Sequence, residues 1–81
     1  MNDAQARDAI RRALAGVAPE VVLDDVGPQE GIREALDLDS LDFLSLVESL
    51  YELTGVEIPE ADYSKVATVG ELSSYVVARA S

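Results

Sequence analysis

The sequence predicts an all-α fold: a small four-helix bundle in a single domain, residues 1–81, with a long loop between helices 1 and 2 and a short third helix. Three observations support this prediction. Apolar residues recur every three or four positions in three segments, as on the buried face of an amphipathic helix. Two of those segments begin with a capping-box pattern. No stretch alternates apolar and polar residues in the way that a half-buried strand does.

The first helix is expected to begin at Asn2, whose side chain can cap it together with Gln5 three residues later. Gly16 and Pro19 are expected to end it. Its apolar stripe consists of Ala6, Ile10, Ala13, Leu14 and Val17. The basic residues of this helix lie off the stripe and predict an ordinary solvated face: Arg7, Arg11 and Arg12.

The following loop covers residues 19–39 and contains Gly27, Pro28 and Gly31. A loop of this length is uncommon in a compact domain. We therefore expect its apolar side chains to pin it across the bundle, with a short helical turn near residues 32–35. The side chains available for this are Val21, Val22, Leu23, Val26, Ile32, Leu36 and Leu38.

The second helix should run from about Leu41 to Thr54 and stop at Gly55. Its core-facing stripe is predicted to be Phe43, Leu46, Val47, Leu50 and Leu53. The other side forms a mixed apolar and acidic surface made by Leu41, Leu44, Ser45, Glu48, Tyr51 and Glu52. An alternative is that Leu44 and Tyr51 are only the edge of a wide core stripe.

A short third helix is expected to have Pro59 at its first position, where proline is favoured. The residues expected to close the core here are Ile58, Tyr63 and Val66. Thr68 and Glu71 have capping-box spacing at the start of the final helix. The apolar face of that helix is predicted to comprise Val69, Leu72, Val76 and Ala80.

The charge of the chain is strongly acidic and uneven. The net charge is −10, and between Glu20 and Asp62 thirteen acidic residues accompany one basic residue, Arg33. Such a surface repels nucleic acid and anionic membranes and attracts proteins with basic patches. The alternative is that the charge only keeps a small domain soluble. With no export segment and no apolar stretch long enough to span a bilayer, a cytoplasmic location is expected.

The sequence also argues against catalysis. It contains no His and no Cys, so no imidazole can activate Ser40, and no thiolate can bind a metal or undergo redox chemistry. A chain of 81 residues buries only a modest core and has little room for an active-site cavity. We therefore expect no catalytic residue and no enzyme activity. Ser40, placed between Asp39 and Leu41 at a helix start, is better suited to accept a covalent group.

Three segments together resemble the acyl carrier proteins: Leu36-Asp37-Leu38-Asp39-Ser40-Leu41-Asp42, Gly55-Val56-Glu57-Ile58-Pro59 and Ala67-Thr68-Val69. The resemblance implies that Ser40 carries 4′-phosphopantetheine, donated by coenzyme A, and that Asp39 aids this modification. It also implies cargo held as a thioester on the arm, whether fatty acyl, polyketide or aminoacyl. The family often has glycine where this chain has Asp37, which puts the subfamily in question.

The implied partners are a phosphopantetheinyl transferase, acyl- or aminoacyl-loading ligases and downstream synthase enzymes with basic patches. They are expected to dock beside Ser40 on a monomeric, stand-alone carrier. The residues expected to contact them are Leu41, Asp42, Leu44, Glu48 and Glu52. The other serines lack the setting of Ser40 and are not expected to be modified: Ser45, Ser49, Ser64, Ser73, Ser74 and Ser81.

Parts of the same sequence are also typical of two other functions. Asp37, Asp39 and Glu48 fall at positions one, three and twelve of a calcium-binding loop. Leu41 offers no oxygen at position five, and Asp42 replaces the turn glycine at position six, so no metal site is expected. The second alternative is an unmodified acidic helical module that binds a protein partner. Modification of Ser40 distinguishes that module from a carrier.

Overall fold

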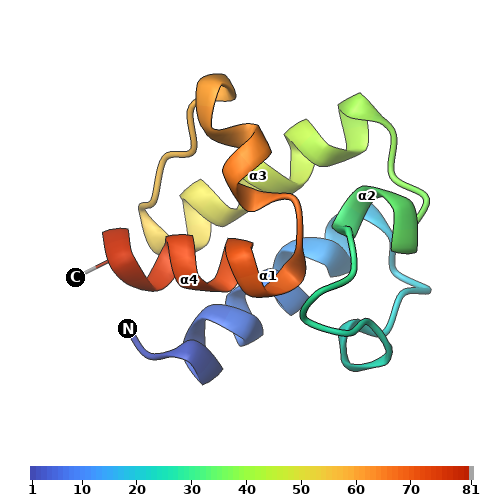
Figure 1. Ribbon diagram of the computed structural model, residues 1–81, viewed down its shortest axis with the longest axis horizontal. Helices are drawn as coiled ribbons and strands as arrows, with labels where there is room; N and C mark the ends of the chain where they lie inside the picture. The colour runs from blue at the N-terminus through green and yellow to red at the C-terminus, as the bar shows by residue number, and fades with distance from the viewer. Residues whose placement is uncertain (81) are drawn as a thin grey trace.

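The computed structural model describes residues 1–80, and all the regular elements of this part of the chain are helices, in agreement with the predicted fold class. The elements, in chain order, are α1 (Asp3–Val17), η1 (Leu23–Asp25), α2 (Ile32–Ala35), α3 (Ser40–Thr54), η2 (Glu60–Val66) and α4 (Val69–Arg79). Helix α1 packs against both α3 and α4, and η2 packs against α4 (Figure 1). Within residues 1–80 no strand forms, and one isolated backbone bridge joins Gly31 to Thr68.

Helix α1 begins as expected, with a complete capping box between Asn2 and Gln5. It does not end at Gly16, which lies inside the helix. Ala18 leaves the helical conformation at φ −142° because the residue before a proline is disfavoured in the α region, so Pro19 is the residue that ends α1. The arginine face is also more than a solvated surface. Arg11 donates to Asp24 of η1 at 3.0 Å, which ties the following loop to α1.

The long loop is pinned across the bundle by its buried side chains, Leu23, Val26, Ile32 and Leu38, as predicted. Val22 was wrongly included, since it is 55% exposed. It has an extended backbone, in which successive side chains point to opposite sides, and Leu23 takes the inward direction. The expected turn at residues 32–35 is helix α2.

Backbone hydrogen bonds also fasten this loop to the start of α4. The amide of Ile32 donates to the carbonyl of Ala67 at 2.8 Å, and the amide of Gly70 donates to the carbonyl of Pro28 at 2.9 Å. These bonds satisfy polar groups that would otherwise be unpaired beside the core. They hold α2 in a fixed position relative to η2 and α4.

Helix α3 ends at Gly55, which takes the left-handed conformation at φ 76°. Four of the five predicted core residues of α3 are buried: Phe43, Leu46, Val47 and Leu50. Leu53 is not a core residue, because 48% of it is exposed. With 3.6 residues per turn, position 53 lies at the edge of the stripe and in the last turn of the helix.

The third helix, η2, has 3₁₀ rather than α geometry, and Pro59 precedes it instead of occupying its first position. Ile58 and Val66 are buried, and Tyr63 packs edge to face on Phe43 with ring centroids 5.2 Å apart. Tyr75 of α4 donates to Asp62 of η2 at 2.6 Å. These contacts close the core between α3, η2 and α4.

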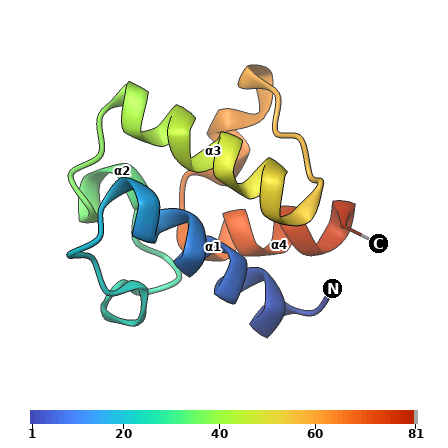
Figure 2. The ribbon, with the colours of Figure 1, turned by 180° about the vertical axis from the view of Figure 1, so that it is seen from behind.

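Helix α4 has the predicted capping box at Thr68 and Glu71. Its buried Ser73 donates to Asp3 of α1, which joins the first and last helices. In both ribbon views the two ends of the chain emerge on one side of the molecule, and α3 begins on the opposite side (Figures 1 and 2). No helix in residues 1–80 combines the length and apolar character that crossing a bilayer requires.

Candidate functional site

Ser40 is the first residue of α3, and its side chain is exposed. The other serines in residues 1–80 lie inside helices, either in α3, in η2 or in α4. Among these, Ser73 is buried and already donates to Asp3. Ser81 lies outside the described residues. Ser40 therefore has the setting at a helix start that the sequence predicted for it.

Asp39 caps α3, so the helix does not use the hydroxyl of Ser40. The carboxylate of Asp39 accepts a hydrogen bond from the amide of Asp42 at 2.8 Å, and its backbone is extended. The first amides of a helix have no partner within it, and the macrodipole favours negative charge at this end. A phosphate on Ser40 would lie where these amides and the dipole favour it.

Arg33 contacts Ser40 directly, and the sequence interpretation missed this. The Nη2 group of Arg33 donates to Oγ of Ser40 at 3.2 Å, from helix α2 to the start of α3. The available signal was the isolation of this cation among thirteen acidic residues. Its proximity to Ser40 depends on the turn between α2 and α3, which the spacing of apolar residues does not reveal.

Asp37 makes that turn possible. It has φ 54° and is the single non-glycine residue with positive φ in residues 1–80. Next to it the amide of Leu38 donates to the carbonyl of Arg33 at 2.9 Å, and the Leu38 side chain is buried. Glycine adopts positive φ without strain, so a glycine at this place in related chains has a conformational reason. Asp37 in place of glycine therefore affects the strain of the backbone and leaves Ser40 at the start of α3.

The exposed side of α3 carries the residues predicted to contact partners. Leu41 is 73% exposed and Leu44 41%, so neither is part of the core. Glu48 and Glu52 are also exposed and lie further along the same helix, whereas Asp42 in the first turn is partly buried. Tyr51 is 53% exposed, so Leu44 and Tyr51 both lie outside the buried core, and these exposures also fit the alternative that the two residues form the edge of a wide core stripe.

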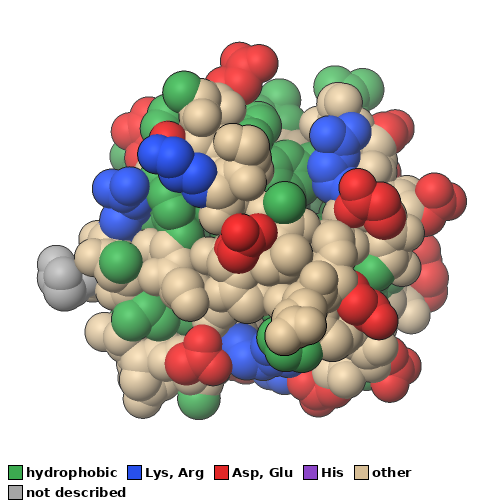
Figure 3. All heavy atoms as spheres, viewed as in Figure 1, with side chains coloured by type: hydrophobic (Ala, Val, Ile, Leu, Met, Phe, Trp, Pro, Cys, Tyr) green, Lys and Arg blue, Asp and Glu red, His purple; other side chains and the backbone are tan. Residues whose placement is uncertain are grey.

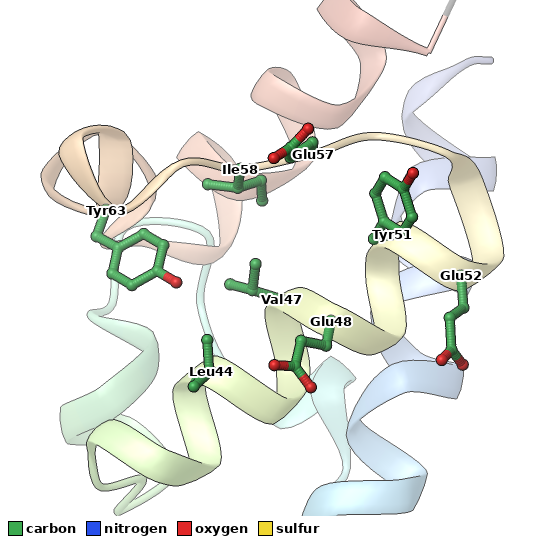
Figure 4. Close-up of a pocket in the computed structure, with 8 residues that line it drawn as sticks. All are labelled: Leu44, Val47, Glu48, Tyr51, Glu52, Glu57, Ile58 and Tyr63. Atoms are coloured by element: carbon green, nitrogen blue, oxygen red, sulfur yellow. The ribbon is translucent and has the colours of Figure 1, made fainter.

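A surface groove of about 510 Å³ runs between α3 and the segment that leads into η2. Figure 4 shows Val47 and Ile58 facing one another across it, with Leu44 and Tyr63 toward one end and Tyr51 toward the other. The carboxylates of Glu48, Glu52 and Glu57 complete its lining. The groove therefore combines apolar walls with an acidic rim.

A second, smaller cavity of about 250 Å³ lies between α2, α3 and η2. It is lined by Arg33, Glu34, Phe43, Tyr63, Ser64 and Ala67, from α2, α3, η2 and the residue after η2. Arg33 thus reaches both this cavity and Ser40. The space-filling view shows acidic side chains gathered at the α2 end of the molecule around a small basic patch (Figure 3).

The acidic residues of the rejected calcium loop do not assemble into a metal site in the described structure. No group of three or more Asp or Glu side chains within residues 1–80 is arranged to hold a metal ion. Asp39 is engaged in capping α3, and Glu48 lies more than two turns further along that helix.

Comparison with known proteins agrees with the resemblance. The family described as "Phosphopantetheine attachment site" matches residues 8–76. The chain is 32% identical to an acyl carrier protein of Acidothermus cellulolyticus over 90% of each chain. It is 43% identical to one from Rubrobacter xylanophilus, of which it covers 65%, a little under two thirds. An acyl carrier protein of Streptomyces coelicolor is 24% identical over 93% of this chain and 82% of its own length.

These matches identify the prosthetic group as 4′-phosphopantetheine. The serine, the helix start and the phosphate-favouring amides described above are consistent with that group. The chain belongs to the acyl carrier proteins, the carriers built around a phosphopantetheine attachment site.

Proposed function

We propose that Ser40 carries the 4′-phosphopantetheine arm and that the chain delivers acyl or aminoacyl groups, bound as thioesters, between enzymes of fatty acid, polyketide or related biosynthesis. One observation supports this above the others: Ser40 is exposed at the start of α3, while Asp39 caps the helix in its place. Its hydroxyl is therefore not needed to cap α3 and is accessible to another enzyme.

Attachment is a phosphoryl transfer from coenzyme A. Oγ of Ser40 forms a bond to the phosphorus next to the pantetheine, the phosphoanhydride bond breaks, and adenosine 3′,5′-bisphosphate leaves with the electron pair. The serine proton passes to the transferase. Asp39 keeps α3 capped, and the amides at the helix start that have no partner would favour the phosphate.

The chain itself acts as a carrier and not as a catalyst. It has no His or Cys to activate a nucleophile, and the reactive thiol belongs to the arm. Its partners would be a phosphopantetheinyl transferase, loading ligases and synthase enzymes, met by a monomer in the cytoplasm.

Mass spectrometry of Ser40→Ala tests the attachment. After incubation with coenzyme A and a broad-specificity transferase, the wild type should gain the mass of one phosphopantetheine and Ser40→Ala none. The fold should persist, since Asp39 supplies the cap. Ser45→Ala, which removes an exposed serine from the same helix, is the matched control and should be modified like the wild type. An unmodified wild type would favour the acidic interaction module instead.

Partner enzymes should dock on the exposed side of α3, through the apolar Leu41 and Leu44 and the carboxylates of Asp42, Glu48 and Glu52. Each client must bring Ser40 to its active site, so this surface is the one that all of them approach. Rim charges act mainly on the rate of encounter, which makes such contacts sensitive to salt.

Charge reversal tests the docking surface. Glu48→Lys should slow phosphopantetheine transfer several-fold at low salt, and the difference should shrink as salt is added. Glu20→Lys makes the same change in the loop after α1 and should behave like the wild type. Equal rates for the two variants would show that recognition does not depend on the acidic side of α3.

A further inference from the structure

We propose that Arg33 is a positioning residue for the prosthetic arm, whose guanidinium pairs with the phosphate that joins the arm to Ser40. The inference rests on the proposed attachment at Ser40 and extends it to a second residue. It predicts which side of the molecule the first part of the arm follows.

The distance between the two side chains already suits this role. Nη2 of Arg33 lies 3.2 Å from Oγ of Ser40, the oxygen that would bear the phosphate. Once that oxygen is esterified, the free oxygens of the phosphate lie one bond beyond the phosphorus and carry the negative charge. Guanidinium binds such oxygens by short charge-assisted hydrogen bonds, stronger than its bond to a neutral hydroxyl.

The partners of the other basic residues distinguish Arg33 from them. The chain has six Lys and Arg residues. Five form ion pairs with an aspartate: Arg7, Arg11, Arg12, Lys65 and Arg79. Among the ion pairs of residues 1–80, none includes Arg33, although Glu34 follows it directly. Its charge remains available for an anion that arrives at Ser40.

The electric field around Ser40 makes such a cation useful. A phosphodiester there adds a negative charge beside Asp37, Asp39 and Asp42, in a stretch whose other charges are all acidic apart from Arg33. Like charges at this spacing repel one another. Arg33 is the one side chain between Glu20 and Asp62 that can offset the repulsion.

Arg33 also gives the phosphate a direction. It donates to Ser40 and also lines the 250 Å³ cavity, together with Glu34, Phe43 and Tyr63. A phosphate paired with Arg33 is held toward this cavity and away from the carboxylates of α3. The start of the arm should follow the same side.

Phosphorus NMR of the modified protein tests the proposal. The wild type, Arg33→Gln, Arg33→Lys and Arg12→Gln are each modified, checked by mass and compared by ³¹P chemical shift and transverse relaxation. Arg12→Gln removes the same charge from the exposed face of α1, where Arg12 pairs with Asp8. Circular dichroism confirms that each variant is folded.

In Arg33→Gln the ratio of paired to free phosphate should fall about two- to fivefold, the range that exposed ion pairs give. The phosphate should then relax more slowly, with a changed chemical shift. The ³¹P shift and relaxation of Arg33→Lys should lie between those of the wild type and Arg33→Gln. Those of Arg12→Gln should match the wild type. Raising salt from about 0.01 M to about 1 M should move the wild type toward Arg33→Gln.

The outcomes separate the two proposals. A wild type that gains no mass refutes the attachment at Ser40. If all four proteins are modified and Arg33→Gln shows the same ³¹P shift and relaxation as the wild type at low salt, Arg33 does not position the arm, and the attachment stands.

Discussion

Asp37 holds a left-handed backbone conformation three residues before Ser40, at φ 54°. Aspartate tolerates this region, glycine occupies it freely, and a β-branched residue is strained there. Asp37→Gly should therefore leave the free energy of unfolding within about 1 kcal/mol of the wild type. Asp37→Val should lower it by about 1–2 kcal/mol. Urea unfolding followed by circular dichroism measures both, and equal stability of Asp37→Val and the wild type would exclude strain at this residue.

Asp62 and Tyr75 make stability depend on pH at both ends of the range. The hydrogen bond from Tyr75 holds the pKa of Asp62 below its usual 3.8, with Lys65 and Arg79 adding to the effect. The bond to Asp62, together with burial, raises the pKa of Tyr75 above 10. The Asp62 contribution is thus present above the unfolded pKa and lost as pH falls through the lower folded value. The Tyr75 contribution is present below pH 10 and lost as pH rises through the higher folded value.

Tyr75→Phe removes this hydrogen bond and keeps the ring that Arg79 covers at 4.1 Å. The wild type should be more stable than Tyr75→Phe at neutral pH, and the difference should shrink below about pH 4 and above about pH 10. Melting temperatures of the two proteins across the pH range measure it. A difference that stays constant from acid to alkali would mean that the hydrogen bond is not linked to these protons.

The sequence was sufficient to place Ser40 at a helix start and Asp39 beside it as a capping residue, because a helix start and its cap are encoded by neighbouring residues. Arg33 could not be identified in the same way. Its contact with Ser40 depends on the left-handed turn at Asp37 and on the burial of Leu38. Neither property follows from the spacing of apolar residues, since both depend on how α2 packs against the other elements.

Helix α4 begins against the loop that precedes α2, and Gly70 contacts this loop directly. A Cβ on Gly70 would lie 2.9 Å from the carbonyl oxygen of Pro28, which also accepts the hydrogen bond from the Gly70 amide. Backbone atoms cannot easily move aside, so Gly70→Ala should cost about 1–3 kcal/mol in unfolding free energy.

Gly16→Ala is the matched control for Gly70→Ala. Gly16 lies in α1, and a Cβ there would meet no atom within 4 Å. Alanine favours the helix, so this change should raise stability by about 0.5–1 kcal/mol. Urea unfolding of the two variants should give shifts of opposite sign. If both variants were more stable than the wild type, helix propensity, rather than the contact with Pro28, would decide the effect of Gly70→Ala.

At the level of elements, repeating patterns were predicted better than their ends. Helices α1, α3 and α4 and the turn at residues 32–35 are predicted by the spacing of apolar residues and by capping patterns. The errors at Gly16, Val22 and Leu53 have a common origin. Each lies at the margin of an element, where apolar spacing alone does not decide whether a residue is helical or covered.

The whole molecule carries sixteen acidic and six basic residues, and ion pairs such as Arg11–Asp24 and Arg12–Asp8 are on the surface. Repulsion among the excess acidic side chains should therefore outweigh the attraction within the ion pairs. Salt screens both interactions. Stability should rise from about 0.01 M to about 1 M sodium chloride. A gain of about 1 kcal/mol would raise the melting temperature of a domain this size by about 4–8 °C.

Thermal unfolding by circular dichroism measures this response. The double variant Glu48→Gln, Glu52→Gln removes two exposed charges from α3 and should respond less to salt than the wild type. A melting temperature independent of salt would mean that repulsion among the excess acidic residues does not measurably lower stability.

Both ends of the chain leave the molecule on the side opposite the start of α3 (Figures 1 and 2). A tether joined to either end would therefore point away from the region around Ser40. Molecules anchored to a bead by a terminal tag would all present that region to the solution in the same orientation. A transferase in the liquid should reach the immobilised serines as completely as it reaches those of the free protein.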